Sequence, residues 1–487
     1  MHAIWDSGIK KPPYKKLLWR HPVLFDCRGH AVTALNQNAV DHFDNTVSLF
    51  LAHSKKTPEA LGLTLAADPQ MLLALIAKGF FYKMLAKVET DPVALEALFK
   101  AKLSVRERGA NHRESELLTA LEEWCYGNLD KAIARLDALL DDYPLDALSV
   151  KITHACQFIR GRNHGMRAST TKIMSAWNEG VRDYGFILGC HSFGLEETGA
   201  YAEAEKTGKR GVEIAPNDAW GTHAVGHVLE MSNRPSEGIN WLSQYQNEWE
   251  NCNNFSYHMH WHKALFHLEL GQKDEVLRLY DSYIRKDHTD DFRDISNGVS
   301  LLYRLELEGV NVGNRWEEMA KLSANHVNDH SLAFADAHYL LAILSSGNTK
   351  AADAFIETMR EKAEGEGTAQ EIFRNYGMPL AKAIHACKTG NDAQCVDHLL
   401  PVFDDLQQIG GSHAQRDVFH RLLIDASIRA QRYSTAKDLL DARLQQRPEN
   451  PWALKRLAKI PEILETVETD EAPTQTVNRQ QNIELVS

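Results

Sequence analysis

The sequence lacks the marks of a secreted or membrane-spanning chain. No stretch approaches the ~18 consecutive apolar residues that a membrane-spanning helix requires. Residues 1–16 contain Asp6 and four lysines but no apolar run of signal-peptide length. The seven cysteines are odd in number and include no Cys-x-x-Cys pair, which indicates neither a disulfide framework nor a zinc knuckle. We therefore expect a soluble cytoplasmic protein with reduced cysteines and no membrane partner.

Basic clusters and standard catalytic motifs are also scarce. The net charge is −12, and the basic runs are limited to Lys10-Lys11 and Lys15-Lys16. Because nucleic-acid binders normally carry a basic face or stripe, we expect no nucleic-acid partner. The sequence has no Gly-x-Gly-x-x-Gly and no phosphate-binding Gly-Lys-Ser/Thr loop, and Ser192 lacks the glycine of a nucleophile elbow. No nucleophilic Ser or Cys can be nominated from sequence.

Internal repeats are present instead. Residues 199–218 read GAYAEAEKTGKRGVEIAPND, in which Gly199, Tyr201, Ala204, Pro216 and Asn217 match the tetratricopeptide pattern. In that pattern glycine ends one helix, the small alanine lets two helices approach closely, and proline stops the second helix. The window therefore predicts a helix pair.

The same template recurs along the chain. Residues 127–146 and 431–450 repeat it clearly, and the step from Gly199 to Asn233 is 34 residues, the tetratricopeptide period. No sustained alternation of apolar and polar residues predicts strands or a hairpin. Weaker copies begin at Asn233, Gly271, Gly347 and Gly390.

These repeats predict an all-α fold, an irregular tetratricopeptide-type solenoid of stacked helix pairs. No Gly/Ser-rich or Pro-rich linker divides the middle of the chain. We therefore expect one domain over residues 1–466, in which residues 1–40 wrap or cap the first helices. Residues 467–487 are polar and are expected to form a C-terminal tail. The oligomeric state cannot be predicted.

Two His-x-x-x-His doublets are the main candidate site. His223 and His227 lie four residues apart with Glu230 three further on, and His258 and His262 repeat the spacing on the next predicted first helix of a pair. Residues four apart share one helix face. Because such helices stack side by side, the two faces are expected to meet, whereas His260 points elsewhere.

Imidazole and carboxylate together suit two kinds of chemistry. They bind zinc, iron or manganese, and they also act as general acids and bases near neutral pH. There is no His-Glu-x-x-His, because Glu230 follows the second histidine. The plain alternative is a set of half-buried histidines bonded to backbone carbonyls. Candidate catalytic residues are His223, His227, Glu230, His258, His262, Asp336 and His338, and the candidate metal ligands are His223, His227, His258 and His262.

Further candidates for ligand binding are two tryptophans and three polar residues on other predicted helices. Arg416 followed by Asp417 suits an anion contact, although such a pair is more often an ion pair at a helix start. This group consists of Trp220, Trp261, His330, Arg416 and Asp417.

From Leu18 to Leu454 the sequence resembles the tetratricopeptide repeat protein 38 family. The resemblance rests on PNDAW (216–220), His223-Ala-Val-Gly-His227, LYRLELEGVNVGNRW (302–316), FADAHYL (334–340) and GGSHAQRDVF (410–419). The resemblance implies an irregular tetratricopeptide solenoid. It also implies that the family's pattern of polar residues is present here as His223, His227, His258, His262, His330 and His338, together with Glu230, Asp336, Arg416 and Asp417. It implies no settled activity.

Two functions therefore compete. One is a His/Asp/Glu/Arg-lined concave pocket that binds or transforms a small polar molecule, with a divalent metal ion as a candidate cofactor. The alternative is a protein–protein interaction scaffold that holds a peptide in its groove. Whether the concave side is open or closed distinguishes them.

Overall fold

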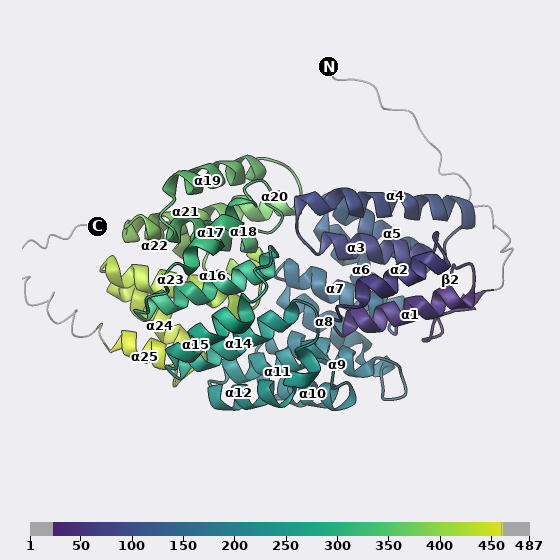
Figure 1. Cartoon of the computed structure of the whole chain (residues 1–487), viewed down its shortest axis with the longest axis horizontal. Helices are drawn as coiled ribbons and strands as arrows, with labels where there is room; N and C mark the ends of the chain where they lie inside the picture. Colours follow the sequence, from purple (N-terminus) through teal and green to yellow (C-terminus); the bar gives the residue numbers. More distant parts are fainter. Residues whose placement is uncertain (1–22, 459, 461–487) are drawn as a thin grey trace, which may run out of the picture.

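The computed structural model describes residues 23–458 and residue 460, and these form an all-α solenoid of tetratricopeptide-like helix pairs (Figure 1). None of the described helices is both long and apolar enough to cross a membrane. The first ten are α1 (Gln37–Leu51), α2 (Thr57–Ala67), α3 (Leu72–Lys83), α4 (Asp91–Arg108), α5 (His112–Cys125), α6 (Leu129–Asp142), α7 (Ala147–Ile159), α8 (Asn163–Ile173), α9 (Tyr184–Glu196) and α10 (Tyr201–Ile214).

The second part of the array continues in the same way to the C-terminal end of the described chain. Its middle helices are α11 (Ala219–Met231), α12 (Pro235–Gln244), α13 (Gln246–Trp249), α14 (Phe255–Glu269), α15 (Lys273–Leu279), α16 (Phe292–Leu307), α17 (Arg315–Ala324) and α18 (Ala333–Ser345). The last are α19 (Thr349–Ala363), α20 (Thr368–Ile372), α21 (Met378–Lys388), α22 (Asp392–Leu399), α23 (His413–Arg429), α24 (Tyr433–Gln446) and α25 (Pro451–Leu457).

The turns fall where the repeats predicted them. Gly199 adopts φ +82° between α9 and α10, and Ala204 is fully buried. Such a backbone conformation costs glycine little and other residues more, which explains the glycine at the end of a helix. The weaker copies share this feature, because Asn233, Gly271, Gly347 and Gly390 all have positive φ and follow helix ends. The prediction of helix pairs is confirmed.

A short hairpin precedes the helices, although the sequence pattern predicted neither strands nor a hairpin. Strands β1 (Leu24–Phe25) and β2 (Ala31–Val32) pair antiparallel, with Leu24 opposite Val32. Each strand has only two residues, too few to show an alternating pattern. The hairpin is fixed by its contacts with a helix end, since Asn111 Nδ2 donates to Ala31 O at 2.9 Å. Of the predicted wrap, residues 1–22 lie outside the described residues, as does the predicted tail 467–487.

The solenoid folds back on itself. Thr368 N, at the start of α20, donates to Gly127 O, between α5 and α6, at 3.0 Å, and Figure 1 shows α20 beside the early helices. Further along, His413 N donates to Glu197 Oε1 at 3.0 Å, and Asn450 Nδ2 donates to Glu269 Oε2 at 3.0 Å. The C-terminal helices therefore cover the inner side of the middle ones.

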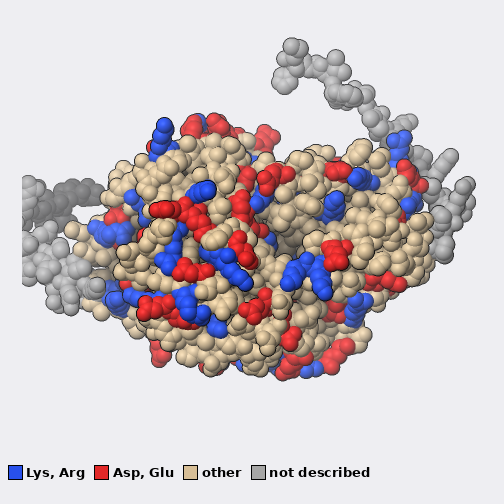
Figure 2. Space-filling view, in the orientation of Figure 1, with Lys and Arg blue, Asp and Glu red and all other residues tan. Residues whose placement is uncertain are grey.

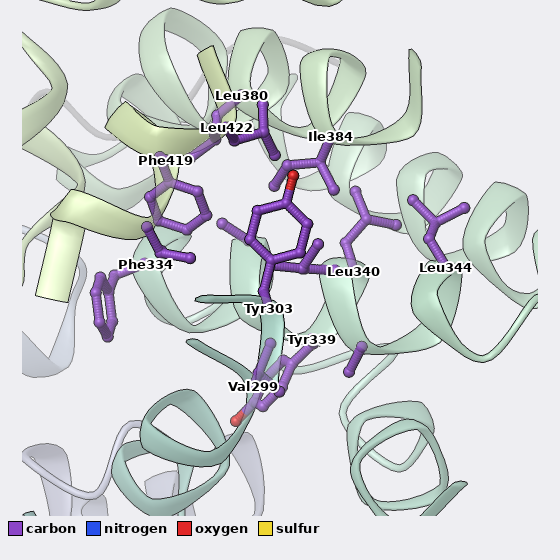
Figure 3. Packing of buried hydrophobic residues seen from close by; sticks show 14 of the residues in the cluster. Val299, Tyr303, Phe334, Tyr339, Leu340, Leu344, Leu380, Ile384, Phe419 and Leu422 are labelled. Carbon is purple, nitrogen blue, oxygen red and sulfur yellow. The ribbon is translucent and has the colours of Figure 1, made fainter. Parts of the chain in front are cut away.

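Helix α23 is one of the helices that pack in the interior. Figure 3 shows Phe419 and Leu422 of α23 packed among Tyr303 of α16, Leu340 of α18 and Ile384 of α21. Because α23 packs on several helices, it carries buried residues around most of its circumference. On the outer surface, Figure 2 shows acidic and basic side chains interspersed over one face of the molecule.

Candidate metal centre

Helices α9, α11 and α14 position the two histidine doublets. Asp218 caps α11, because its carboxylate accepts a hydrogen bond from Trp220 N at 3.1 Å. Glycines let α9 approach α11 closely, since a Cβ on Gly189 would lie 3.0 Å from the Cα of Gly221. The absence of side chains at this crossing brings α9 within reach of the histidines of α11.

The four imidazoles converge through one nitrogen each. His227 Nε2 lies 2.9 Å from His223 Nε2, and His223 Nε2 lies 3.1 Å from His258 Nε2. His258 Nε2 in turn lies 3.1 Å from His262 Nε2. One nitrogen from each ring falls within 4.8 Å of the others, and all four residues are buried. The structure thus brings together the two faces whose spacing predicted that they would meet.

The opposite nitrogens of three of the four rings face oxygen atoms. His258 Nδ1 lies 3.0 Å from Asn297 Oδ1 of α16, and His262 Nδ1 lies 3.2 Å from Glu230 Oε2. His227 Nδ1 lies 3.6 Å from Glu196 Oε2 of α9, longer than a hydrogen bond. Among the described residues His223 Nδ1 has no hydrogen-bond partner. Oxygen acceptors on the outer ring nitrogen orient an imidazole so that its other nitrogen can bind a metal.

This arrangement leaves the lone pairs of two Nε2 atoms, those of His258 and His262, facing each other. Asn297 and Glu230 accept hydrogen bonds, which places the N–H of His258 and His262 on Nδ1. The Nε2 atoms of these two rings are then both acceptors, yet they lie 3.1 Å apart. Two acceptors at that distance repel unless a cation lies between them. Burial also lowers the pKa of all four imidazoles, to about 3 for His262, so a second proton on a ring is costly.

Aromatic rings surround the cluster and exclude water. Phe193 of α9 lies 5.5 Å from His223 and 5.3 Å from His227, measured between ring centroids. The predicted ligand-binding tryptophans belong to this wall. Trp220 lies 5.0 Å from His223, and Trp261 stacks on His258 at 5.2 Å while its Nε1 donates to Ser300 Oγ. A dry apolar wall strengthens the interaction between a metal ion and its ligands.

The predicted residues in and just before α18 do not join the cluster: Asp336 and His338 lie on this helix, and His330 precedes it. His330 pairs with Asp336 through Nδ1 and packs near Phe355 and Phe373. His338 Nδ1 lies 2.8 Å from Phe334 O, the backbone-bonded arrangement given above as the plain alternative. Within the described part of the chain, the side-chain hydrogen bonds of these three residues do not reach the four histidines. His260 also points away, toward Trp249 and Tyr283, as predicted.

Arg416 and Asp417 lie on α23 but do not pair with each other. Asp417 accepts from Arg421 Nε at 2.7 Å and contacts Arg443 and Arg304. Burial alone would raise the pKa of Asp417, but these guanidinium groups hold it well below its usual value. Arg416 points instead toward α9, where its Nη2 lies 3.8 Å from Glu197 Oε2.

Sequence reasoning missed Glu196 and Asn297, which face His227 and His258. Glu196 is fully buried, and neither of its carboxyl oxygens has a hydrogen-bond partner within the described chain. Burial and the nearby carboxylates of Glu197 and Glu230 raise its pKa well above the usual value. The sequence signal that could have pointed to Glu196 was the Glu196-Glu197 pair, which follows a largely apolar run.

A hollow of about 210 Å³ lies away from the four histidines, between the early helices and α20. It is lined by residues such as Lys83, Trp124, Gly127, Thr368 and Phe373, and it includes none of the predicted site residues. The four histidines themselves are buried.

Comparisons with known proteins bear on the fold alone. No protein-family model matches the chain. A solved structure of human IFIT1, a dimer with PPP-AAAA, has 12% sequence identity and a TM-score of 0.41, covering 89% of this chain and 96% of that one. Yeast Tom70 has 12% identity and a TM-score of 0.32, covering 90% of this chain and 91% of that one. Both are helical solenoids of tetratricopeptide type.

The exclusion of nucleic acid from composition was wrong. Solved structures of IFIT1 hold PPP-AAAA and m7Gppp-AAAA, so a helical solenoid can bind an oligonucleotide. Net charge and the scarcity of basic runs report averages over the chain, whereas binding depends on a local surface.

Proposed function

We propose that this chain is a metal-binding solenoid protein, and that His223, His227, His258 and His262 hold one divalent transition-metal ion through their Nε2 atoms. The observation that carries the proposal is the 3.1 Å separation of His258 Nε2 and His262 Nε2, whose outer nitrogens both face oxygen acceptors. A cation between the rings turns this repulsion into four favourable contacts. The burial of the four imidazoles among aromatic rings also supports a metal site.

The ligand set favours a first-row transition metal over calcium or magnesium, which prefer oxygen ligands. Zinc is the first expectation, because four protein ligands around a buried point are typical of its closed sites. Nitrogens ~2.0–2.1 Å from one zinc ion lie roughly 3.3 Å apart in a tetrahedron. The three neighbouring pairs of Nε2 atoms lie 2.9–3.1 Å apart, so these pairs would separate by a few tenths of an ångström on binding. All four ligand nitrogens lie within 4.8 Å of one another, so the other pairs have to adjust to the same spacing.

A second function, binding or transforming a small polar molecule beside the metal, is favoured by the charged groups behind His227. Within the described residues Glu196 has two buried oxygens without hydrogen-bond partners, and Arg447 Nη2 lies 3.9 Å from Glu230 Oε1, too far for a hydrogen bond. Arg416 faces the same region from α23. We propose that a small polar ligand binds among these carboxylates and guanidinium groups, next to the metal and not in an open groove.

We further propose that the chain belongs with the tetratricopeptide repeat protein 38 family, on the motifs quoted above. The alternative function, an interaction scaffold, is compatible with the fold. The scaffold function predicts that replacing the four histidines leaves partner binding unchanged. The metal proposal predicts that the same replacement abolishes the function of the protein, because it removes the metal.

X-ray absorption spectroscopy of the protein loaded with one equivalent of zinc tests the ligand set. We expect four nitrogen scatterers at ~2.0–2.1 Å with the multiple-scattering signature of imidazole. A spectrum dominated by oxygen ligands, or one with fewer than three imidazoles, would contradict the proposed centre. The matched control is the His260→Ala variant, which removes a nearby histidine of α14 that points away from the cluster.

A further inference from the structure

Two cysteines outside the histidine cluster lie side by side on the α21–α22 helix hairpin. Cys387 is in the last turn of α21 and Cys395 is in the first turns of α22, each four residues from Asn391. Antiparallel helices joined by a short turn bring such symmetric positions together, and the two thiols adjoin in the structure. Cys395 is fully buried, whereas Cys387 is only half-buried.

Polar groups surround the sulfur of Cys387. Arg429 Nη2 of α23 donates to Cys387 Sγ at 3.3 Å, and the hydroxyl of Tyr303 lies 3.8 Å from the same sulfur. Figure 3 shows the Tyr303 ring rising from α16 between Ile384 and Leu422. Arg429 is held in place by Asp392, which accepts from its Nη2 at 2.7 Å and its Nε at 2.9 Å.

Cys387 differs from the other six cysteines in its electrostatics. Burial raises the pKa of Cys125 and Cys190 to about 11 and that of Cys252 to about 12. Exposed Cys27 also has a pKa raised to about 11. The pKa of Cys387 is instead lowered to about 7. The neighbouring thiol of Cys395 lowers it most, Arg429 and Tyr303 lower it further, and burial acts in the opposite direction. A partly exposed thiol beside a guanidinium is typical of reactive cysteines.

We propose that Cys387 is a hydroperoxide-reactive thiol and that Cys395 is its resolving partner, because the two thiols adjoin and Arg429 contacts the more exposed one. This site is separate from the histidine cluster and does not depend on the proposed metal. Its co-reactant is hydrogen peroxide or an organic hydroperoxide.

The chemistry balances in two steps. The Cys387 thiolate attacks one peroxide oxygen, so the S–O bond forms, the O–O bond breaks, and the leaving hydroxide or alkoxide takes a proton. The Cys395 thiol then gives up its proton and attacks the sulfenic sulfur, so the S–S bond forms, the S–O bond breaks and water leaves. The two thiols lose two electrons and the peroxide gains them. A reduced dithiol returns the pair to its starting state.

Peptide mapping after peroxide treatment tests the site, because trypsin cleaves after Lys388 and separates the two cysteines. We expect residues 383–388 and 389–416 to be recovered as a disulfide-linked pair after treatment of the folded chain with a few equivalents of hydrogen peroxide. The Cys395→Ala variant should instead give Cys387 that is trapped by dimedone as a sulfenic acid. Absence of both the linked peptide and the trapped adduct, in chains whose circular dichroism is unchanged, would overturn the proposal.

Alkylation rates give an independent readout that needs no oxidant. At pH 7 iodoacetamide should label Cys387 on the order of tenfold faster than the more exposed Cys27, because the thiolate is the nucleophile. Arg429→Gln should reduce that advantage, because it removes the guanidinium beside the Cys387 sulfur. Arg432→Gln, which breaks an exposed ion pair with Asp397, is the matched control and should leave the rate unchanged. A wild-type Cys387 that reacts no faster than Cys27, or an Arg429→Gln rate equal to wild type, would contradict the assigned role of the thiolate.

Discussion

His262 of α14 and Glu230 of α11 join two helices of the array inside the molecule. Glu230 Oε2 of α11 lies 3.2 Å from His262 Nδ1 of α14, while His262 Nε2 faces the other imidazoles. The carboxylate therefore sets the orientation of the ring and increases the basicity of the nitrogen that faces the cluster. Such carboxylate–histidine pairs behind a metal ligand raise its affinity.

Substitution of Glu230 tests this orienting role. Glu230→Gln keeps the size of the side chain but weakens the acceptor, so we expect zinc affinity to fall by about 10–100-fold. Competition with a chromogenic chelator measures the affinity. Glu237→Gln on α12, which affects an exposed ion pair with Arg234, should leave it unchanged. Equal affinities for the two variants would show that Glu230 does not orient the ligand.

Removal of one ligand should have a larger effect. His227→Ala takes away the ring that lies 2.9 Å from His223 and leaves three imidazoles, so we expect more than a 100-fold loss of zinc affinity. Titration calorimetry checks this against His260→Ala. If both variants bind zinc like the wild type, the four histidines are structural.

Metal binding should stabilise the folded chain, because the four residues converge only when α11 and α14 are packed together. At a free zinc concentration 100 times the dissociation constant, binding contributes about 2.7 kcal/mol to the free energy of unfolding. We expect a strong chelator to lower the melting temperature by several degrees and zinc to restore it. Calcium should not restore it, since it prefers oxygen ligands. A melting temperature that responds to neither chelator nor zinc would argue against a bound metal.

Asp417 should make stability depend on acid pH. Three guanidinium groups hold the pKa of the buried carboxyl well below its unfolded value, so its ionised form stabilises the folded state above that value. This stabilisation is lost progressively as pH falls from the unfolded pKa of about 4 toward the lower pKa of the folded state. Asp417→Asn should therefore cost about 3–5 kcal/mol at pH 7 and roughly 1 kcal/mol less at about pH 3. Urea unfolding at both values measures the difference, and a cost independent of pH would contradict the assigned ionic role.

The array should also behave as one unit. Contacts such as Thr368 N to Gly127 O and His413 N to Glu197 Oε1 join early and late helices, so we propose that the solenoid is a single domain. Limited proteolysis should leave residues 23–458 as one fragment. Two separately folded halves after a cut in the middle would show that these contacts are weak.

Local patterns predicted local features of this fold well. Gly199 and Ala204 lie within one helix pair, and the His223/His227 and His258/His262 spacings follow from the helix period. Glu196 and Asn297 could not be predicted, because their contact with the histidines depends on how α9 and α16 pack against α11 and α14. The same reason explains why His338 lies apart, and why the return of α23 into the interior was not foreseen.

Elemental analysis of the protein purified without a metal-affinity tag tests the central claim most directly. The account predicts about one equivalent of a divalent transition metal per chain in the wild type, retained in His260→Ala and lost when His223 and His258 are both replaced by Ala. Wild-type protein that contains no such metal, and that takes up none when zinc, iron or copper is supplied, would contradict it.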